Sequence, residues 1–364
     1  MSSPRRVELL DLLRGAVIVW MALDHTRDFF QPAGTNPENL DTTSVALFAT
    51  RWITHLCAPT FVFLAGVGMG MQVQRKGPKP ELMAFFAKRG LWLMALEVTW
   101  VSWSWFFALA PTHLGVLWGI GGAMVLAAPF AKLSARWQAV LGGLTLLALT
   151  VVQPAKVGFF SALVRPFSFE VADHQVISVY VIIPWWTVMM LGMAAARLFD
   201  SDERRTELRR IGLGLLVAFV GLRALNLADP APWSAHERGP VVTALSFLRV
   251  SKYPPSMAYL AATLGTSFVM GSFLLHLPER VRGVLRTFGR VPLFYYLLHL
   301  PFLHLLGTVY ATVVYDAERI PSSAPLSLPL IYGAWLLATA VLYWPCRAYD
   351  HRKSTRRAPW MRYL

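Results

Sequence analysis

The stretch LDLLRGAVIVWMALDHTRDFF, from Leu10 to Phe30, combines an apolar run of membrane-spanning length with several ionisable side chains. About 20 predominantly apolar residues cross a bilayer as a helix, so the stretch predicts a transmembrane segment. Ionisable groups inside such a segment are costly unless a partner or a water-filled cavity receives them, and they therefore indicate a functional site. The groups are Asp11, Arg14, Asp24, His25, Arg27 and Asp28.

The helical period places part of this set on one face. At about 100° per residue, Asp11, Arg14 and His25 fall close together, and Arg14 and His25 are about 16 Å apart along the axis. One polar stripe therefore joins the two membrane surfaces.

The composition extends this interpretation to the whole chain. Of its 364 residues, 55% are hydrophobic, and the mean hydropathy is +0.48. Long apolar runs recur to the last segment, which is typical of a polytopic membrane protein. We expect an all-α fold with about ten transmembrane helices, in a single transmembrane domain over residues 1–364. The expected spans are residues 9–30, 46–73, 84–107, 114–131, 137–154, 176–198, 208–228, 256–276, 291–314 and 327–346.

The net charge of +14 is explained by topology. Basic residues gather in alternate connections and in both tails, whereas the loops at 31–44, 108–113 and 315–326 hold only Arg319. By the positive-inside rule, both termini are cytoplasmic. We therefore expect no nucleic acid partner. The sequence also has no metal-binding motif, and no metal is expected.

Further segments carry a family resemblance. The spacings Asp-x-x-Arg and Arg-x(10)-His within LDLLRGAVIVWMALDH are similar to those of the first helix of the transmembrane acyltransferase superfamily. Four other segments resemble the bacterial branch of the heparan-α-glucosaminide N-acetyltransferase catalytic-domain family, in matching order over nearly the whole chain. They are APTFVFLAGVGMG (58–70), IIPWWTVMMLGMAAARLF (182–199), SKYPPSMAYLAATLG (251–265) and FGRVPLFYYLLHL (288–300).

The resemblance implies acyl transfer across a bacterial inner (plasma) membrane. The donor would be cytosolic acetyl-CoA, and the acceptor an amine or hydroxyl of a sugar-containing molecule on the outer side. The heparan enzyme has its catalytic histidine in the loop after the first span, whereas residues 26–44 contain none. A homodimer is one option for the assembly. The alternative class is a transporter or exporter of a small polar or glycosyl substrate along the same polar stripe, and coenzyme A binding would separate the two.

Two histidines are candidates for the catalytic base. Transfer from a thioester requires a group that takes the proton of the acceptor, and histidine titrates in the suitable range. His25 has Asp28 at i+3 to orient its imidazole, and the alternative is a solvated helix end. His55 lies one turn after Arg51 on the second span, with Asp24 as the expected partner if it is the base, and the alternative is a packed structural histidine.

Other residues are candidates for binding the donor. Arg14, Lys88, Arg89 and Arg290 are expected to form a basic mouth for the phosphates of coenzyme A, although topology explains these charges equally well. His299 is expected to contact the pantetheine or thioester region, and a structural Tyr–His network is its alternative. His304 is turned about 140° from His299 on the same helix, which argues for two separate polar contacts.

The acceptor is expected at the outer surface. Candidate residues are Arg51, Lys252, Tyr253 and Trp103. Lys252 and Tyr253 belong to one of the family-like segments, and they either shape the acceptor site or fix the start of the eighth span. Tryptophans also anchor helices at membrane surfaces, so sugar stacking by Trp103 competes with that simpler role.

Overall fold

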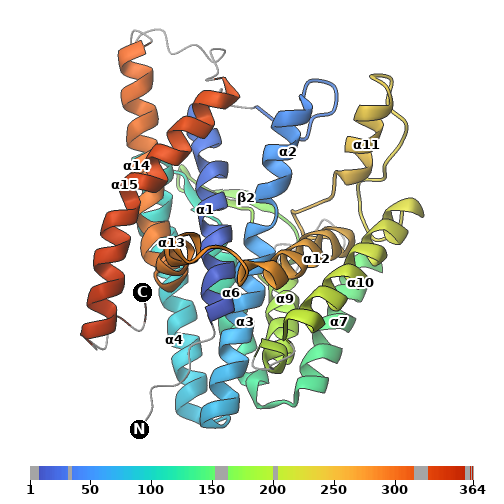
Figure 1. Cartoon of the computed structure of the whole chain (residues 1–364), viewed down its shortest axis with the longest axis vertical. Helices are drawn as coiled ribbons and strands as arrows, with labels where there is room; N and C mark the ends of the chain where they lie inside the picture. Colours follow the sequence, from blue (N-terminus) through green and yellow to red (C-terminus); the bar gives the residue numbers. More distant parts are fainter. Residues whose placement is uncertain are drawn as a thin grey trace. The chain divides into compact units, whose positions relative to one another are not determined.

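The computed structural model describes residues 8–31, 35–151, 163–199, 204–314, 327–356, 361 and 363, and these are mostly helical (Figure 1). The chain divides into two compact units. The first contains Met1–Leu10, Ala58–Ser234 and Phe247–His276, and the second contains Asp11–Cys57, Ala235–Ser246 and Leu277–Leu364.

The first unit contains a set of packed helices and a small sheet. Its elements are α3 (Cys57–Lys76), α4 (Pro80–Leu96), the π-helix η1 (Glu97–Val101), α5 (Ser102–Phe106), β1 (Thr112–Leu114), α6 (Val116–Ala127), η2 (Pro129–Lys132), α7 (Ala135–Val151), β2 (Phe167–Val171), β3 (His174–Ser178), α9 (Ile182–Ala194), η3 (Ala195–Phe199), α10 (Arg204–Ala224) and α12 (Met257–Leu274). Helix α10 packs along α12, α4 packs on α6, and α9 contacts both α6 and α7.

Glycines permit the closest of these helix contacts. A Cβ at Gly212 would lie 2.8 Å from the carbonyl oxygen of Gly265, where α10 meets α12. A Cβ at Gly90 would lie 2.5 Å from the carbonyl oxygen of Gly121, where α4 meets α6. Small residues that let two backbones approach are typical of helix packing in membranes.

The second unit is built mainly from α1 (Glu8–Phe30), α2 (Val45–Thr54), α11 (Pro240–Leu248), α13 (Glu279–Arg290), α14 (Pro292–Val314) and α15 (Leu328–Thr355). Helices α14 and α15 lie side by side, and α13 contacts both (Figure 1). A buried cluster of Leu23 and Ile331, with Trp335 against it, joins α1 to α15. Helix α1 also meets α13 at glycines, because a Cβ at Gly289 would clash with the backbone of Asp11.

Every predicted span coincides with helix over most of its length. Among the described residues, five helices are long and apolar enough to cross a membrane, so the chain is a membrane protein. They are Val45–Lys76, Ile182–Phe199, Met257–Leu274, Pro292–Val313 and Leu328–Thr355. Helix α1 is not among them because of its ionisable residues. The count of ten spans and the orientation of the termini stay predictions, and the tail residues 1–7 and the loop at 315–326 lie outside the described residues.

The expectation of an all-α fold was wrong in one region. A three-stranded sheet has the order β1-β3-β2, with β1 parallel and β2 antiparallel to β3. The predicted span at 176–198 therefore begins in β3, and its helix begins at Ile182. The alternation in FSFEV suits a strand, and the turn before HQVIS has Ala172 and Asp173 at positive φ, as in a tight hairpin.

Candidate functional site

Two buried histidines from distant parts of the chain meet in the second unit. Nδ1 of His25 on α1 lies 2.7 Å from Nε2 of His299 on α14. The ring centroids are 5.0 Å apart, and the planes differ by 13°. His25 is 9% exposed and His299 is fully buried. The sequence proposed both residues for the site, but it assigned them to different roles and did not predict their contact.

The backbone fixes how protons are arranged in this pair. Nδ1 of His299 lies 3.1 Å from the carbonyl oxygen of Tyr295, which can only accept a hydrogen bond. With both rings neutral, His299 therefore carries its proton on Nδ1 and accepts at Nε2. His25 must then donate from Nδ1, and its lone pair is on Nε2. That is the protonation state that a general base requires.

Aromatic rings surround the pair. The ring of Tyr295 stacks on His299 with centroids 5.2 Å apart, and Tyr296 contacts the rings of both His25 and His299. His304 instead stacks on Phe29, at 4.9 Å. The prediction that His299 and His304 make separate contacts is confirmed.

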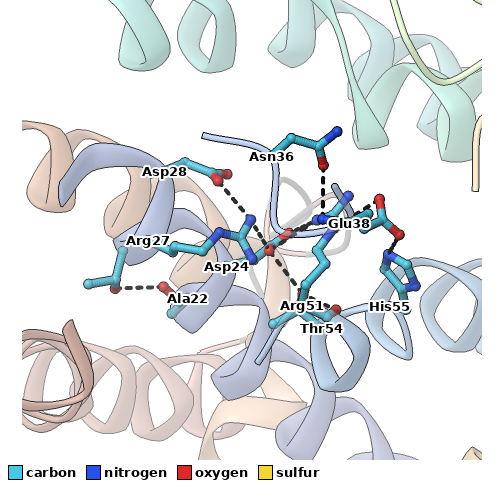
Figure 2. A network of polar contacts seen from close by, with 10 residues as sticks. Ala22, Asp24, Arg27, Asp28, Asn36, Glu38, Arg51, Thr54 and His55 are labelled. Carbon is cyan, nitrogen blue, oxygen red and sulfur yellow. Dashed lines mark hydrogen bonds and ion pairs between the residues drawn. The ribbon is translucent and has the colours of Figure 1, made fainter. Parts of the chain in front are cut away.

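A network of ion pairs lies one residue away along α1 (Figure 2). Asp24 accepts hydrogen bonds from Nη1 of Arg51 at 2.7 and 3.0 Å, and from Oγ1 of Thr54 at 2.9 Å. Nη2 of Arg27 lies 2.6 Å from Asp24 and 2.8 Å from Asp28. Because Asp24 and Arg27 are buried, these contacts replace the water that the charges lose.

Two predicted partnerships differ in the structure. Asp28 contacts Arg27 rather than His25, whose imidazole is held by His299 instead. Nε2 of His55 lies 3.2 Å from Oε1 of Glu38, whereas Asp24 was the expected partner. The reason is that Asp24 already lies between two arginines, which offer a carboxylate stronger hydrogen bonds than a neutral ring does.

Glu38 adds a third carboxylate to the network, beside Asp24 and Asp28. It lies 3.9 Å from Nε of Arg51 on α2 and 3.2 Å from Nε2 of His55 at the end of that helix, so both predicted residues face the same glutamate (Figure 2). The sequence analysis missed Glu38. An acidic residue in a short loop between two helices that carry buried cations is the signal that identifies it.

A second cluster lies at the start of α1. Nη1 of Arg14 is 3.7 Å from Asp11, and Nε of Arg290 is 3.6 Å from the other oxygen of the same carboxylate. Nη1 of Arg290 is also 3.4 Å from Asp350. The side chains of Arg14 and Arg290 are 25% and 33% exposed. Two of the four predicted donor-binding cations therefore lie together around one aspartate.

The other predicted residues belong to the first unit. Lys88 is exposed on α4 beside Arg89, and their grouping with Arg14 and Arg290 stays a prediction. Trp103 is 37% exposed, and its ring contacts those of Trp100 and Phe107, which suits a surface aromatic cluster. Lys88, Arg89 and Trp103 do not by themselves indicate a site.

Lys252 and Tyr253 lie just before α12. The ammonium group of Lys252 is 5.0 Å from the centroid of the Tyr253 ring and 5.5 Å from that of Tyr180. Tyr253 also lines a pocket of about 540 Å³ in the first unit. The sequence therefore selected a lysine and a tyrosine that contact each other beside a cavity.

One buried carboxylate was missed altogether. Glu97 is fully buried, and its two oxygens accept hydrogen bonds from the backbone amides of Gly115, at 3.0 Å, and Leu117, at 2.8 Å. These amides belong to the first turn of α6, so Glu97 caps that helix from another segment. An acidic residue in the middle of an apolar segment was the available signal.

The described residues contain no group of three or more His, Cys, Asp and Glu side chains placed to hold a metal ion.

The fold and the site define a membrane protein with a buried histidine pair beside an ion-pair network. The family model for heparan-alpha-glucosaminide N-acetyltransferase, catalytic, matches residues 6–227, which is more than half of the chain. The chain belongs to this family and is thereby an acyltransferase by class. The match includes His25 and stops before His299. No curated protein matches the chain.

Proposed function

We propose that this protein transfers an acetyl group from cytosolic acetyl-CoA to an amine or hydroxyl of a sugar-containing acceptor on the other side of a bacterial inner membrane. The observation that carries the proposal is the contact between His25 and His299, because it gives a buried histidine on α1 a defined basic nitrogen. The family name, which describes acetyl transfer to a glucosaminide, supports the reaction class and the kind of acceptor.

The residues of this chain would act as follows. Nε2 of His25 takes the proton from the attacking hydroxyl or amine of the acceptor, while His299 keeps the ring in its basic tautomer. The new bond joins the acetyl carbon to the acceptor oxygen or nitrogen, and the thioester C–S bond breaks. The proton held by His25 then passes to the leaving thiolate, which regenerates the base. No covalent intermediate is needed, and an acetyl-histidine route is the alternative.

Arg14 and Arg290 suit the phosphates of the donor. Guanidinium groups bind phosphates strongly, and these two are partly exposed and held together through Asp11. Nζ of Lys353 lies 3.5 Å from the carbonyl oxygen of Arg290, which adds a third cation to the cluster. The cluster thus brings three cations, Arg14, Arg290 and Lys353, to one end of α1. Along α1, Arg14 and His25 are about 16 Å apart, so an extended donor can reach from one to the other.

His55 is the competing candidate for the base. Its contact with Glu38 resembles the carboxylate–histidine arrangement that activates an imidazole. We favour His25 because the carbonyl of Tyr295 determines its tautomer through His299, whereas the contact of His55 depends on whether that ring is protonated.

The test uses the purified full-length protein in detergent, with glucosamine as the acceptor probe and release of free coenzyme A thiol as the readout. His25→Ala should lower the rate by about 10²–10⁴, the usual contribution of a general base. It should still show an increase in melting temperature with acetyl-CoA, since a ligand that binds only the folded state stabilises it. His304→Ala, on the same helix as His299, is the matched control.

Arg14→Ala should reduce the melting shift that acetyl-CoA produces, and Arg286→Ala, which removes an arginine paired with the exposed Glu279, should not. Normal turnover in His25→Ala, together with an inactive His55→Ala that binds acetyl-CoA, would move the base to His55. The absence of both a melting shift and calorimetric heat at saturating acetyl-CoA would favour the transporter or exporter class instead.

A further inference from the structure

Lys252 is a largely buried lysine that has no acidic partner among the described residues. The residue is 7% exposed, and its ammonium group lies over the rings of Tyr180 and Tyr253. Within the described parts of the chain, this ammonium has no ion pair and no hydrogen bond. The faces of aromatic rings attract a cation less strongly than an anionic partner does. The position therefore suits a charge that is completed by a bound anion.

The two rings form adjoining walls of this position. Tyr180 and Tyr253 meet edge to face, with centroids 5.4 Å apart and planes at 78°. Two rings at this angle cover two sides of the ammonium group. A lysine carries three N–H donors, so donors remain for an anionic oxygen.

A pocket adjoins the same residues. Tyr253 and Ser256 line a cavity of about 540 Å³ together with Arg165 and Asp229. Ligand cavities of about 300–1,000 Å³ are the usual size for small molecules, and this one has room for a sugar. Because Tyr253 belongs both to the cavity wall and to the surroundings of Lys252, a ligand in the cavity can place an anionic group at the lysine.

The charges at the cavity favour an anion. Asp229 accepts hydrogen bonds from the backbone of Ser251 at 3.0 Å and from Oγ of Ser256 at 2.5 Å, and it lies 3.8 Å from Nη1 of the buried Arg223. Its negative charge is therefore matched inside the fold. Arg165 forms no ion pair with any described residue. Arg165 therefore gives the cavity wall a positive charge, and Lys252 adds a second cation beside that wall, next to Tyr253.

We propose that Lys252, with Tyr180 and Tyr253, binds the carboxylate or phosphate of an acidic sugar whose ring occupies the neighbouring cavity. That this sugar is the acceptor of the acetyl group rests on the proposed function, whereas the binding of the anion does not. The site thus narrows the acceptor from sugars in general to anionic ones.

The test compares four probes on the purified full-length protein at constant ionic strength. Glucuronate and glucose 6-phosphate carry the two candidate anions on a sugar, glucose carries neither, and glycerol 3-phosphate represents a lipid headgroup. Both anionic sugars should raise the melting temperature, and glucose and glycerol 3-phosphate should raise it less. Lys252→Met should weaken the binding of the anionic sugars about tenfold or more, the usual loss of a charged hydrogen bond.

Lys132→Met makes the same substitution at an exposed lysine and should leave the binding of all four probes unchanged. If Lys252→Met does not fold, two other variants replace it. Lys252→Gln removes the positive charge at this position, and Lys252→Arg keeps it. Equal shifts with glucose and glucuronate, no shift with either anionic sugar, or unchanged binding in the charge-removing variant would each overturn the proposal. Glycerol 3-phosphate binding as well as the anionic sugars would overturn the assignment to a sugar.

Acetyl-CoA is titrated in parallel to separate the two proposals. An acetyl-CoA shift without a difference among the sugars would leave the proposed function standing and remove this site. A difference among the sugars without an acetyl-CoA shift would keep the anion site and would contradict acetyl-CoA as the donor in the proposed function.

Discussion

Nδ1 of His25 and Nε2 of His299 are 2.7 Å apart although 274 positions separate them in the sequence. A backbone carbonyl on α14 thereby determines which nitrogen of a histidine on α1 carries the proton. A neutral imidazole has one donor and one acceptor, so fixing one ring fixes the next. His299 is then a positioning residue, which acts on the reaction through His25.

Substitutions at His299 test this relationship. His299→Ala removes the acceptor for Nδ1 of His25, so we expect the rate of acetyl transfer to fall and the pH–rate profile to shift. His299→Gln offers a side-chain oxygen that accepts from Nδ1, so it should recover part of the rate. The measurement is coenzyme A release across a pH series. A merely structural role would lower the melting temperature of both variants without moving the pH profile.

Asp24 and Asp28 provide a matched pair on one helix. Asp24 is 8% exposed and joins Arg27, Arg51 and Thr54, whereas the side chain of Asp28 is 36% exposed. Asp24→Asn should cost about 3–5 kcal/mol, because it leaves the buried Arg27 and the largely buried Arg51 without their shared carboxylate. Asp28→Asn should cost about 1 kcal/mol or less. Unfolding in a denaturing detergent series measures both, and equal losses would contradict the assignment of Asp24 as the centre of the network.

The sequence predicted the helices well because their determinants are local. Apolar length alone identifies a span, and every predicted segment contains helix. The sheet was missed because only average hydropathy was considered. Strand β3 was absorbed into the span predicted at 176–198, and β2 lies between two predicted spans, where no element was predicted. The alternation in FSFEV and the Ala172–Asp173 turn were the better guide.

The partners within the site could not be predicted in the same way. The spacing along α1 correctly selected Asp24, His25 and Asp28 as polar residues of one helix end, but it could only propose partners at i+3 or on the next span. Glu38 and His299 enter from other segments, and tertiary packing decides those contacts. Burial of a charge says that a partner is needed without saying which residue supplies it.

Gly289 is expected to be essential for the contact between α13 and α1. An added Cβ would clash with the backbone of Asp11, so Gly289→Ala must push the helices apart, at a typical cost of about 1–3 kcal/mol. The shift should also weaken acetyl-CoA binding, since Arg290 follows directly and pairs with Asp11. Gly283→Ala on the same helix meets nothing within 4 Å and should be neutral or stabilising. Equal melting temperatures for the two variants would contradict the close approach.

The orientation in the membrane is the last prediction, and it determines where the donor enters. The alternation of basic loops places residues near 206 in the cytoplasm and residues near 42 outside. Thr206→Cys and Thr42→Cys introduce the same change at two exposed positions, and the native Cys57 and Cys346 are both buried, so the unsubstituted protein serves as the background. In intact cells, an impermeant thiol reagent should label Thr42→Cys and should label Thr206→Cys only after lysis. The opposite pattern would invert the protein, put the cluster of Arg14 and Arg290 outside, and remove the cytosolic entrance for acetyl-CoA.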